Sequence, residues 1–89
     1  EPTELIGTGK TSDENYVTET IRRVREINPD IMVLQGAGIS NGEDVYNTIM
    51  LGAEATGSTS GLFKAADPAA MVEEMISALR AAWDEKHKA

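Results

Sequence analysis

A glycine-rich turn followed by lysine and threonine lies near the start of the sequence, at residues 7–11 (GTGKT). It matches the end of a P-loop, G-x-x-x-x-G-K-[ST], whose backbone amides cradle nucleotide phosphates. The first glycine of that pattern would fall at Glu4, where a carboxylate would repel a phosphate. The stretch therefore does not predict an ATP site. Its small residues still expose backbone N–H groups, which can donate hydrogen bonds to an anion.

Two further loops of small residues occur at 36–40 (GAGIS) and 59–61 (TSG), and each follows a predicted strand. In a parallel α/β sheet such loops emerge at the same edge, at the carboxyl ends of the strands. Together with the loop at 6–9, they could converge on a single anion. Neutral backbone dipoles would then bind a phosphate despite the acidic net charge of the chain.

The pair Gly36-x-Gly38 after a strand also invites comparison with a dinucleotide-binding fingerprint, G-x-G-x-x-G. The third glycine of that fingerprint would be Asn41, and no acid ends a following strand at the right distance. The sequence therefore does not favour a dinucleotide site.

The composition limits the remaining classes. With 89 residues the chain makes one small domain at most, and its formal net charge of −7 argues against non-specific binding to nucleic acid or to an anionic membrane. The sequence has no cysteine and no apolar run long enough to span a bilayer, which excludes a thiolate metal site and fits a cytoplasmic protein.

Alternation of helical and strand-like segments predicts an α/β fold with parallel pairing. We treat 1–89 as a single segment whose first part, 1–11, is a loop. The expected elements are a helix at 12–28, a strand at 31–35, a helix at 41–51, a strand at 53–59 and a helix at 67–84.

Local signals support these bounds. The acids in Ser12-Asp13-Glu14 favour a helix start, and Asn28-Pro29 stops that helix. Ser40 and Glu43 have the spacing of a capping box, and Asp67-Pro68 combines an N-cap with a proline at the first helical position. The apolar run 31–34 is typical of a strand buried on both faces.

The stretches EPTELIGTGK, GAGISNGEDV and STSG, in this order, resemble the C-terminal part of triosephosphate isomerases, closest to the archaeal-type enzymes. In that family a catalytic glutamate in a Glu-Pro pair precedes a mobile lid that ends in Ile-Gly-Thr-Gly. The resemblance covers essentially all of the chain. It implies the last portion of a (β/α)8 TIM barrel: the sixth loop (the lid) and helix, then the seventh and eighth strands and helices.

The resemblance also implies an activity, the interconversion of dihydroxyacetone phosphate and glyceraldehyde 3-phosphate. Glu1 corresponds to the base that moves a proton between the two carbons through an enediol(ate), beneath a lid that excludes water. Ile6 and Gly7 correspond to the C-terminal hinge of the lid, where the Gly7 amide faces phosphate.

Substrate-binding residues are implied in the other two loops. Gly38, with Ser40 close by, matches the position after the seventh strand that contacts substrate. Thr59 and Ser60 match the amide pair that binds phosphate before a short helix. The family functions as a homo-oligomer, a dimer or tetramer, without metal or cofactor.

One part of the family's machinery is not found in these residues. Its electrophilic lysine and histidine lie in the first half of the barrel, whereas Lys10 follows the lid and the single histidine, His87, lies in a charged tail. We therefore expect the 89 residues alone to be inactive. Two alternatives stay open: a non-catalytic phosphate-binding or assembly module built from a partial barrel, and another barrel enzyme that handles phosphate. The Glu-Pro pair followed by a lid argues against the second.

Overall fold

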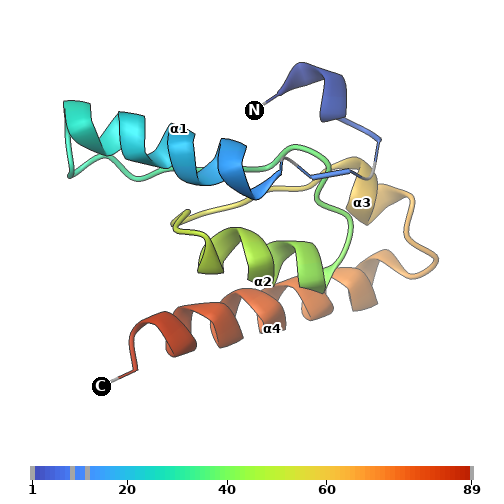
Figure 1. Cartoon of the computed structure of the whole chain (residues 1–89). Coiled ribbons are helices and arrows are strands. Elements are labelled where there is room, and N and C mark those ends of the chain that lie inside the picture. Colours follow the sequence, from blue (N-terminus) through green and yellow to red (C-terminus); the bar gives the residue numbers. More distant parts are fainter. Residues whose placement is uncertain (1, 9, 12, 89) are drawn as a thin grey trace.

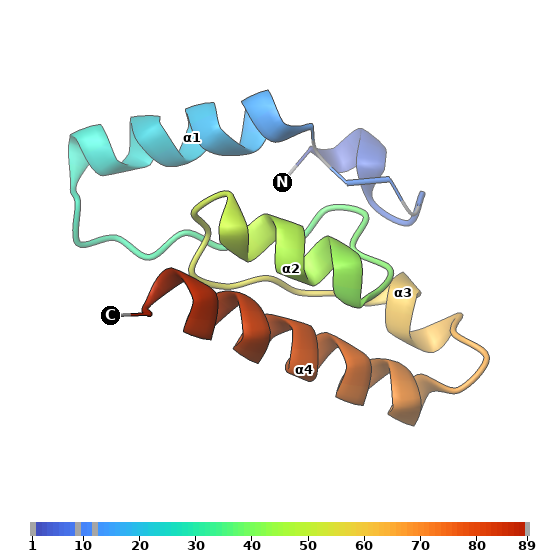
Figure 2. The ribbon, with the colours of Figure 1, turned by 60° about the horizontal axis from the view of Figure 1, so that its bottom comes forward.

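The computed structural model describes residues 2–8, 10–11 and 13–88 (Figure 1). Two extended segments separate helix α1 from α2 and α2 from the short α3. Helices α1, α2 and α4 run in the same direction in both ribbon views, as in successive β–α units (Figures 1 and 2). The elements are the 3₁₀ turn η1 (Thr3–Leu5), α1 (Glu14–Ile27), α2 (Gly42–Met50), α3 (Ser60–Phe63) and α4 (Pro68–Lys86).

Side-chain caps fix where the long helices begin. The Asp13 carboxylate accepts from the Tyr16 amide at 2.9 Å, and the Asp67 carboxylate accepts from the Ala70 amide at 3.1 Å, with Pro68 at the first helical position. Helix α2 differs from expectation, because Asn41 rather than Ser40 is its N-cap. The helices expected at 12–28, 41–51 and 67–84 thus span 14–27, 42–50 and 68–86.

The strands expected at 31–35 and 53–59 do not form as regular strands in the part of the chain that the structure describes. The two segments pair in parallel through one isolated bridge, between Leu34 and Ala55. The Val33 carbonyl accepts from the Ala55 amide, and the Gln35 amide donates to the Ala55 carbonyl. The direction of pairing therefore agrees with a parallel sheet, whereas the regular ladder is absent.

The polar sequence of the second segment explains the missing ladder. The Thr56 hydroxyl donates to the Gln35 carbonyl and the Ser58 hydroxyl donates to the Ile39 carbonyl, each at 2.7 Å. Side chains thus take carbonyls that backbone amides would take in a regular strand. Gly57, between them, has no side chain to pack.

Two apolar clusters hold the helices to the extended segments. One lies beneath α1 and the other lies between α2 and α4, which pack side by side. The buried members of the first are Val17, Ile21, Val33 and Ala53, and those of the second are Ile39, Val45 and Met75.

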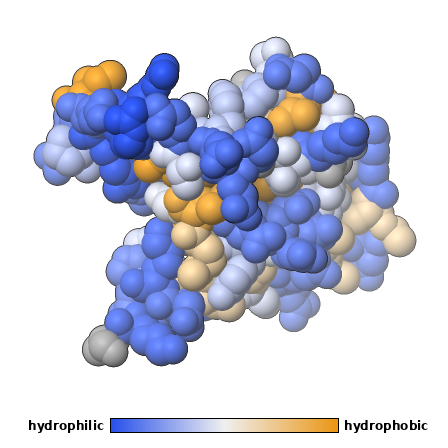
Figure 3. All heavy atoms as spheres, viewed as in Figure 1, coloured by the Kyte–Doolittle hydropathy of each residue, from blue (hydrophilic) through white to orange (hydrophobic). Residues whose placement is uncertain are grey.

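Only one face of the first extended segment is covered. Val33 and Gln35 are 9% and 7% exposed, whereas Met32 and Leu34 are 72% and 61% exposed. The strand was expected to be buried on both faces, and in this chain it is not. The molecule is a slab of 40 × 36 × 18 Å, so a single layer of helices backs the segments. On the face seen in Figure 3, hydrophobic residues appear as small patches on a mostly hydrophilic surface.

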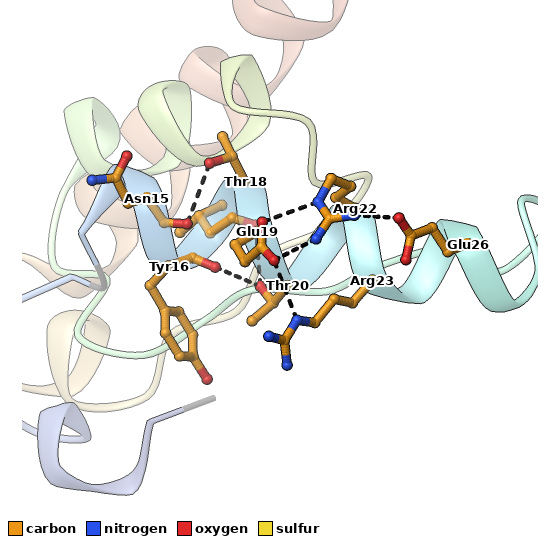
Figure 4. Close-up of polar contacts among 9 residues, drawn as sticks. Asn15, Tyr16, Thr18, Glu19, Thr20, Arg22, Arg23 and Glu26 are labelled. Atoms are coloured by element: carbon orange, nitrogen blue, oxygen red, sulfur yellow. Dashed lines mark hydrogen bonds and ion pairs between the residues drawn. The ribbon is translucent and has the colours of Figure 1, made fainter.

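The outer surface of α1 carries an ion-pair network (Figure 4). Arg22 bonds both Glu19 and Glu26, and Arg23 also contacts Glu19. The hydrogen bond from Arg22 is the main cause that lowers the pKa of Glu19 to about 2. These groups are solvent-exposed, and such pairs add little to stability. Among the described residues, no helix has the length and apolar character needed to cross a bilayer.

A more buried pair links α1 to the second extended segment. Arg25 bonds the Glu54 carboxylate, and its Nη2 also donates to the Gly52 carbonyl at 3.1 Å. The other Glu54 oxygen accepts from the Val33 amide at 2.9 Å. Burial raises the pKa of Glu54, but the hydrogen bonds from Val33 and Arg25 outweigh it and hold that pKa below its usual value.

We expect Glu54→Ala to lower the free energy of unfolding by about 1–3 kcal/mol at pH 7, because the Val33 amide and Arg25 lose their acceptor. Since the folded pKa is depressed, the contribution is complete above the unfolded pKa of about 4.3 and disappears as the pH falls through the folded value. Urea unfolding of the parent and the variant at pH 7 and at pH 3 measures the loss of unfolding free energy and its dependence on pH. Glu85→Ala, which removes an exposed pair with Lys88, is the control and should change little. Equal losses for the two variants would contradict this role.

Candidate active-site cleft

A cleft of about 370 Å³ opens where the two extended segments end and α2 and α3 begin. Three segments far apart in sequence line it: 6–8 from the N-terminal loop, 36–40 before α2, and 59–61 at the start of α3. Their approach follows from the parallel pairing, because parallel segments place their carboxyl ends at one edge. The described site residues predicted from sequence all line this cleft: Ile6, Gly7, Gly38, Ser40, Thr59 and Ser60.

Glu1, the predicted base, lies outside the described residues. Its role therefore stays a prediction from sequence. Of the remaining N-terminal loop, residues 3–5 form the 3₁₀ turn η1. The Thr8 hydroxyl donates to the Leu5 carbonyl at 2.7 Å and accepts from the Lys10 amide at 3.0 Å, which holds the chain after this turn in a compact bend.

The end of this loop lies against the start of α3. Gly7 has a φ of 77°, and a Cβ built on it would lie 3.7 Å from the Ser60 hydroxyl oxygen. Left-handed backbone of this kind favours glycine, which has no Cβ to clash with the following carbonyl. The Gly7 position thus lets the loop bend toward the residues predicted to bind phosphate.

Gly38 permits the closest contact in the cleft. Its φ is 72°, and a Cβ on it would lie 1.7 Å from the Lys10 carbonyl oxygen. No side chain fits in that space, so the loop that follows the first extended segment can lie directly against the N-terminal loop only because residue 38 is glycine.

Gly61 has the same role at the third segment. A Cβ there would lie 2.4 Å from the Ile39 carbonyl oxygen, the same oxygen that accepts from the Ser58 hydroxyl. The first turn of α3 therefore packs directly on the 36–40 loop. Thr59, at the N-cap of α3, makes no side-chain cap, so the first amides of this turn receive no side-chain acceptor.

Ser40 is in the cleft, but its polar groups already have a partner. Both its amide and its hydroxyl donate to the same Asp44 carboxylate oxygen, each at 3.0 Å. The Asn41 side chain accepts from the Asp44 amide at 2.9 Å and so caps α2. The capping box predicted for Ser40 and Glu43 does not form, because Asn41 is the N-cap and the Asp44 carboxylate accepts from Ser40, one residue before it. An anion at Ser40 would therefore compete with the Asp44 carboxylate.

Sequence reasoning missed one charged residue of the cleft. Lys64 lines it and is the C-cap of α3, one helical turn after Ser60. The signal was available, since residues four apart share a helix face. No group of acidic and histidine residues suited to a metal ion occurs in the described part of the chain.

Comparison with known proteins gives the family. The family model for triosephosphate isomerase matches residues 1–82. The chain is 47% identical over 79 residues to triosephosphate isomerase from Methanocaldococcus jannaschii, which covers 85% of this chain and 36% of that protein. It is 45% identical over 84 residues to the enzyme from Saccharolobus solfataricus, which covers 91% of this chain and 37% of that protein. The chain thus spans about a third of the length of the curated relatives it matches.

A solved structure shares the fold at low sequence similarity. The Amycolatopsis orientalis BexX/CysO complex contains a chain that superposes with a TM-score of 0.79 at 23% identity, over 94% of this chain and 33% of that one. This likeness concerns the fold alone. The family match and the archaeal relatives agree with each other, and the chain therefore belongs to the triosephosphate isomerase family as part of a TIM barrel.

Proposed function

We propose that the chain is the C-terminal portion of a triosephosphate isomerase barrel and supplies its base and its phosphate-binding loops. The observation that carries this proposal is the cleft, in which the six described residues predicted from sequence lie together although three separate segments provide them. The reaction would interconvert dihydroxyacetone phosphate and glyceraldehyde 3-phosphate in a cytoplasmic homo-oligomer. No cofactor is part of the proposal.

In the proposed mechanism, each part of the cleft has a separate task. Backbone amides of the segments at Gly7 and at Thr59-Ser60 bind the phosphate, which fixes the distance from the anchor to the reacting carbons. Glu1 removes a proton from one carbon and returns it to the neighbouring one, while the hydroxyl proton passes from one oxygen to the other with the help of electrophilic groups outside these 89 residues. The loop that begins at Pro2 closes over the substrate, and excluding water strengthens the electrostatic interactions inside.

The open face of the slab supports the partial-barrel part of this proposal. Met32 and Leu34 are exposed on the side of the extended segment opposite α1 and α2, where the remaining strands of a closed barrel would pack. The same face supports the second candidate function, a non-catalytic module that binds phosphate and assembles through its apolar side. Isomerase turnover separates the two, because only the first requires it.

Both candidate functions require phosphate to bind in the cleft, so a phosphate-binding experiment tests this requirement for both. We expect inorganic phosphate to shift the amide NMR signals of Gly7, Ser60 and Gly61 in the 89-residue chain. In Gly61→Ala the new Cβ would push the first turn of α3 away from the Ile39 carbonyl. We expect this shift to cost about one hydrogen bond between the amides of that turn and phosphate, and so to weaken phosphate binding about tenfold.

Gly57→Ala is the matched control. A Cβ at Gly57 meets no atom within 4 Å, so this variant should bind phosphate as the parent does. An unchanged spectrum of the parent at high phosphate would contradict a phosphate site in the cleft. Equal weakening by the two alanine variants would show that the geometry at Gly61 is not responsible.

A further inference from the structure

Lys64 is the one charged side chain among the described residues that line the cleft. The other described lining residues are glycines, hydroxyl-bearing residues and apolar side chains. The chain as a whole carries a net charge of −7, so the field of the protein opposes the approach of a phosphate dianion. Because the other described lining residues carry no charge, a cation at the cleft would be the main electrostatic attraction for such a ligand.

The short helix α3 determines where Lys64 lies. The Lys64 amide donates to the Ser60 carbonyl at 2.9 Å, so a single turn returns the chain to the side of Ser60. Ser60 and Lys64 therefore occupy one face of α3, next to the end of the N-terminal loop at Gly7.

No ion pair engages Lys64 within the described residues. The ion pairs found there involve Arg22, Arg23, Arg25, Arg80 and Lys88. By contrast, Arg25 at the opposite end of the extended segments is bonded to Glu54 and to a carbonyl. As far as the described residues are concerned, the ammonium of Lys64 is thus available to a ligand without first breaking an ion pair.

We propose that Lys64 is a ligand-binding residue of the cleft, whose ammonium attracts the phosphate dianion and contacts its outer oxygens. The inference rests on the proposed function, since it assigns a further contact to the same phosphate site. Lys64 supplies charge that the amides lack, and its flexible stem lets it meet the ligand at the rim of the cleft. The expected result is tighter binding that weakens as salt rises.

The experiment compares inorganic phosphate binding to the 89-residue chain and its variants at two salt concentrations, by titration of amide NMR signals. Lys64→Gln should bind about tenfold more weakly at low salt, with a smaller salt dependence than the parent. Lys64→Arg keeps the charge and should stay within about threefold of the parent. Lys88→Gln makes the same change of net charge in the tail and should be within about twofold of the parent.

Separate outcomes overturn separate claims. If the parent binds phosphate and Lys64→Gln binds equally well, Lys64 has no role and the proposed function stands. If Lys64→Gln and Lys88→Gln weaken binding equally, net charge alone is responsible and the inference is wrong. If the parent does not bind phosphate, both the role of Lys64 and the proposed phosphate site are wrong. Lys64→Met, a second neutral side chain of similar length, replaces Lys64→Gln if thermal unfolding shows that glutamine destabilises the fold.

Discussion

A barrel that carries Glu1→Gln is expected to lose about 10²–10⁴-fold in isomerase turnover while binding phosphate as its parent does. The parent for this test is the Methanocaldococcus jannaschii relative in which the matching region is replaced by these 89 residues, which are 47% identical to it over 79 residues. Glutamine keeps the size of the side chain but cannot accept a proton from carbon. The phosphate contacts come from other loops, so they should remain.

Glu4→Gln is the control for this prediction. It makes the same change three residues away, at an exposed position in η1 that takes no part in the proposed chemistry. Steady-state turnover and the inhibition constant of inorganic phosphate are the two measurements. A parallel loss of turnover and phosphate binding in Glu1→Gln would point to a structural role for Glu1, and full activity would exclude it as the base.

Gly38→Ala is expected to have the largest effect on the cleft itself. A left-handed φ of 72° costs a non-glycine residue about 1–2 kcal/mol, and the new Cβ would overlap the Lys10 carbonyl at 1.7 Å. Relief of that overlap requires the N-terminal loop to move away from the 36–40 loop, and overpacking of this kind costs about a further 1–3 kcal/mol. We therefore expect both a less stable protein and weaker phosphate binding.

Urea unfolding and phosphate titration test this prediction together, with Gly57→Ala as the control at an open position. If alanine at 38 left the unfolding free energy and the phosphate affinity unchanged, the close approach of Lys10 to Gly38 would not exist in solution. If only stability fell, the contact would hold the fold together without shaping the phosphate site.

The long helices could be predicted from sequence because local chemistry defines them. Asp13 and Asp67-Pro68 cap α1 and α4 with their own side chains, and Gly52, at φ 123°, follows the end of α2. The capping box expected at Ser40 and Glu43 does not form, because Asn41 is the N-cap and accepts from the Asp44 amide, while the Asp44 carboxylate accepts from Ser40. Ser40 and Asn41 are both favourable N-cap residues, and only the conformation of the surrounding loop decides which of them caps α2.

Regular strands and complete burial could not be predicted in the same way, because they depend on neighbours outside each segment. The apolar run 31–34 predicts a strand covered on both faces, yet nothing in the described chain covers Met32 and Leu34. Helix α4 shows the same limit. Among the apolar residues of this helix, Met75 is buried, whereas Ile76 and Trp83 are exposed. An apolar pattern indicates which faces need a partner, but it does not supply one.

The sequence predicted which loops line the cleft, but it did not predict the individual contacts of their side chains. The small residues after each extended segment marked the three segments that meet there. The engagement of Ser40 by Asp44 and the place of Lys64 on the face of Ser60 depend on how short turns fold, and the family resemblance alone did not give them.

The central claim is that these residues supply the base and the phosphate loops of an isomerase, and one measurement tests it most directly. Turnover of dihydroxyacetone phosphate is compared for the 89-residue chain and for the chimeric barrel that contains it. We predict no turnover by the chain alone, because its only histidine, His87, lies at the end of α4 and not in the cleft, and clear turnover by the chimera. A folded chimera without turnover, or an active isolated chain, would contradict the account.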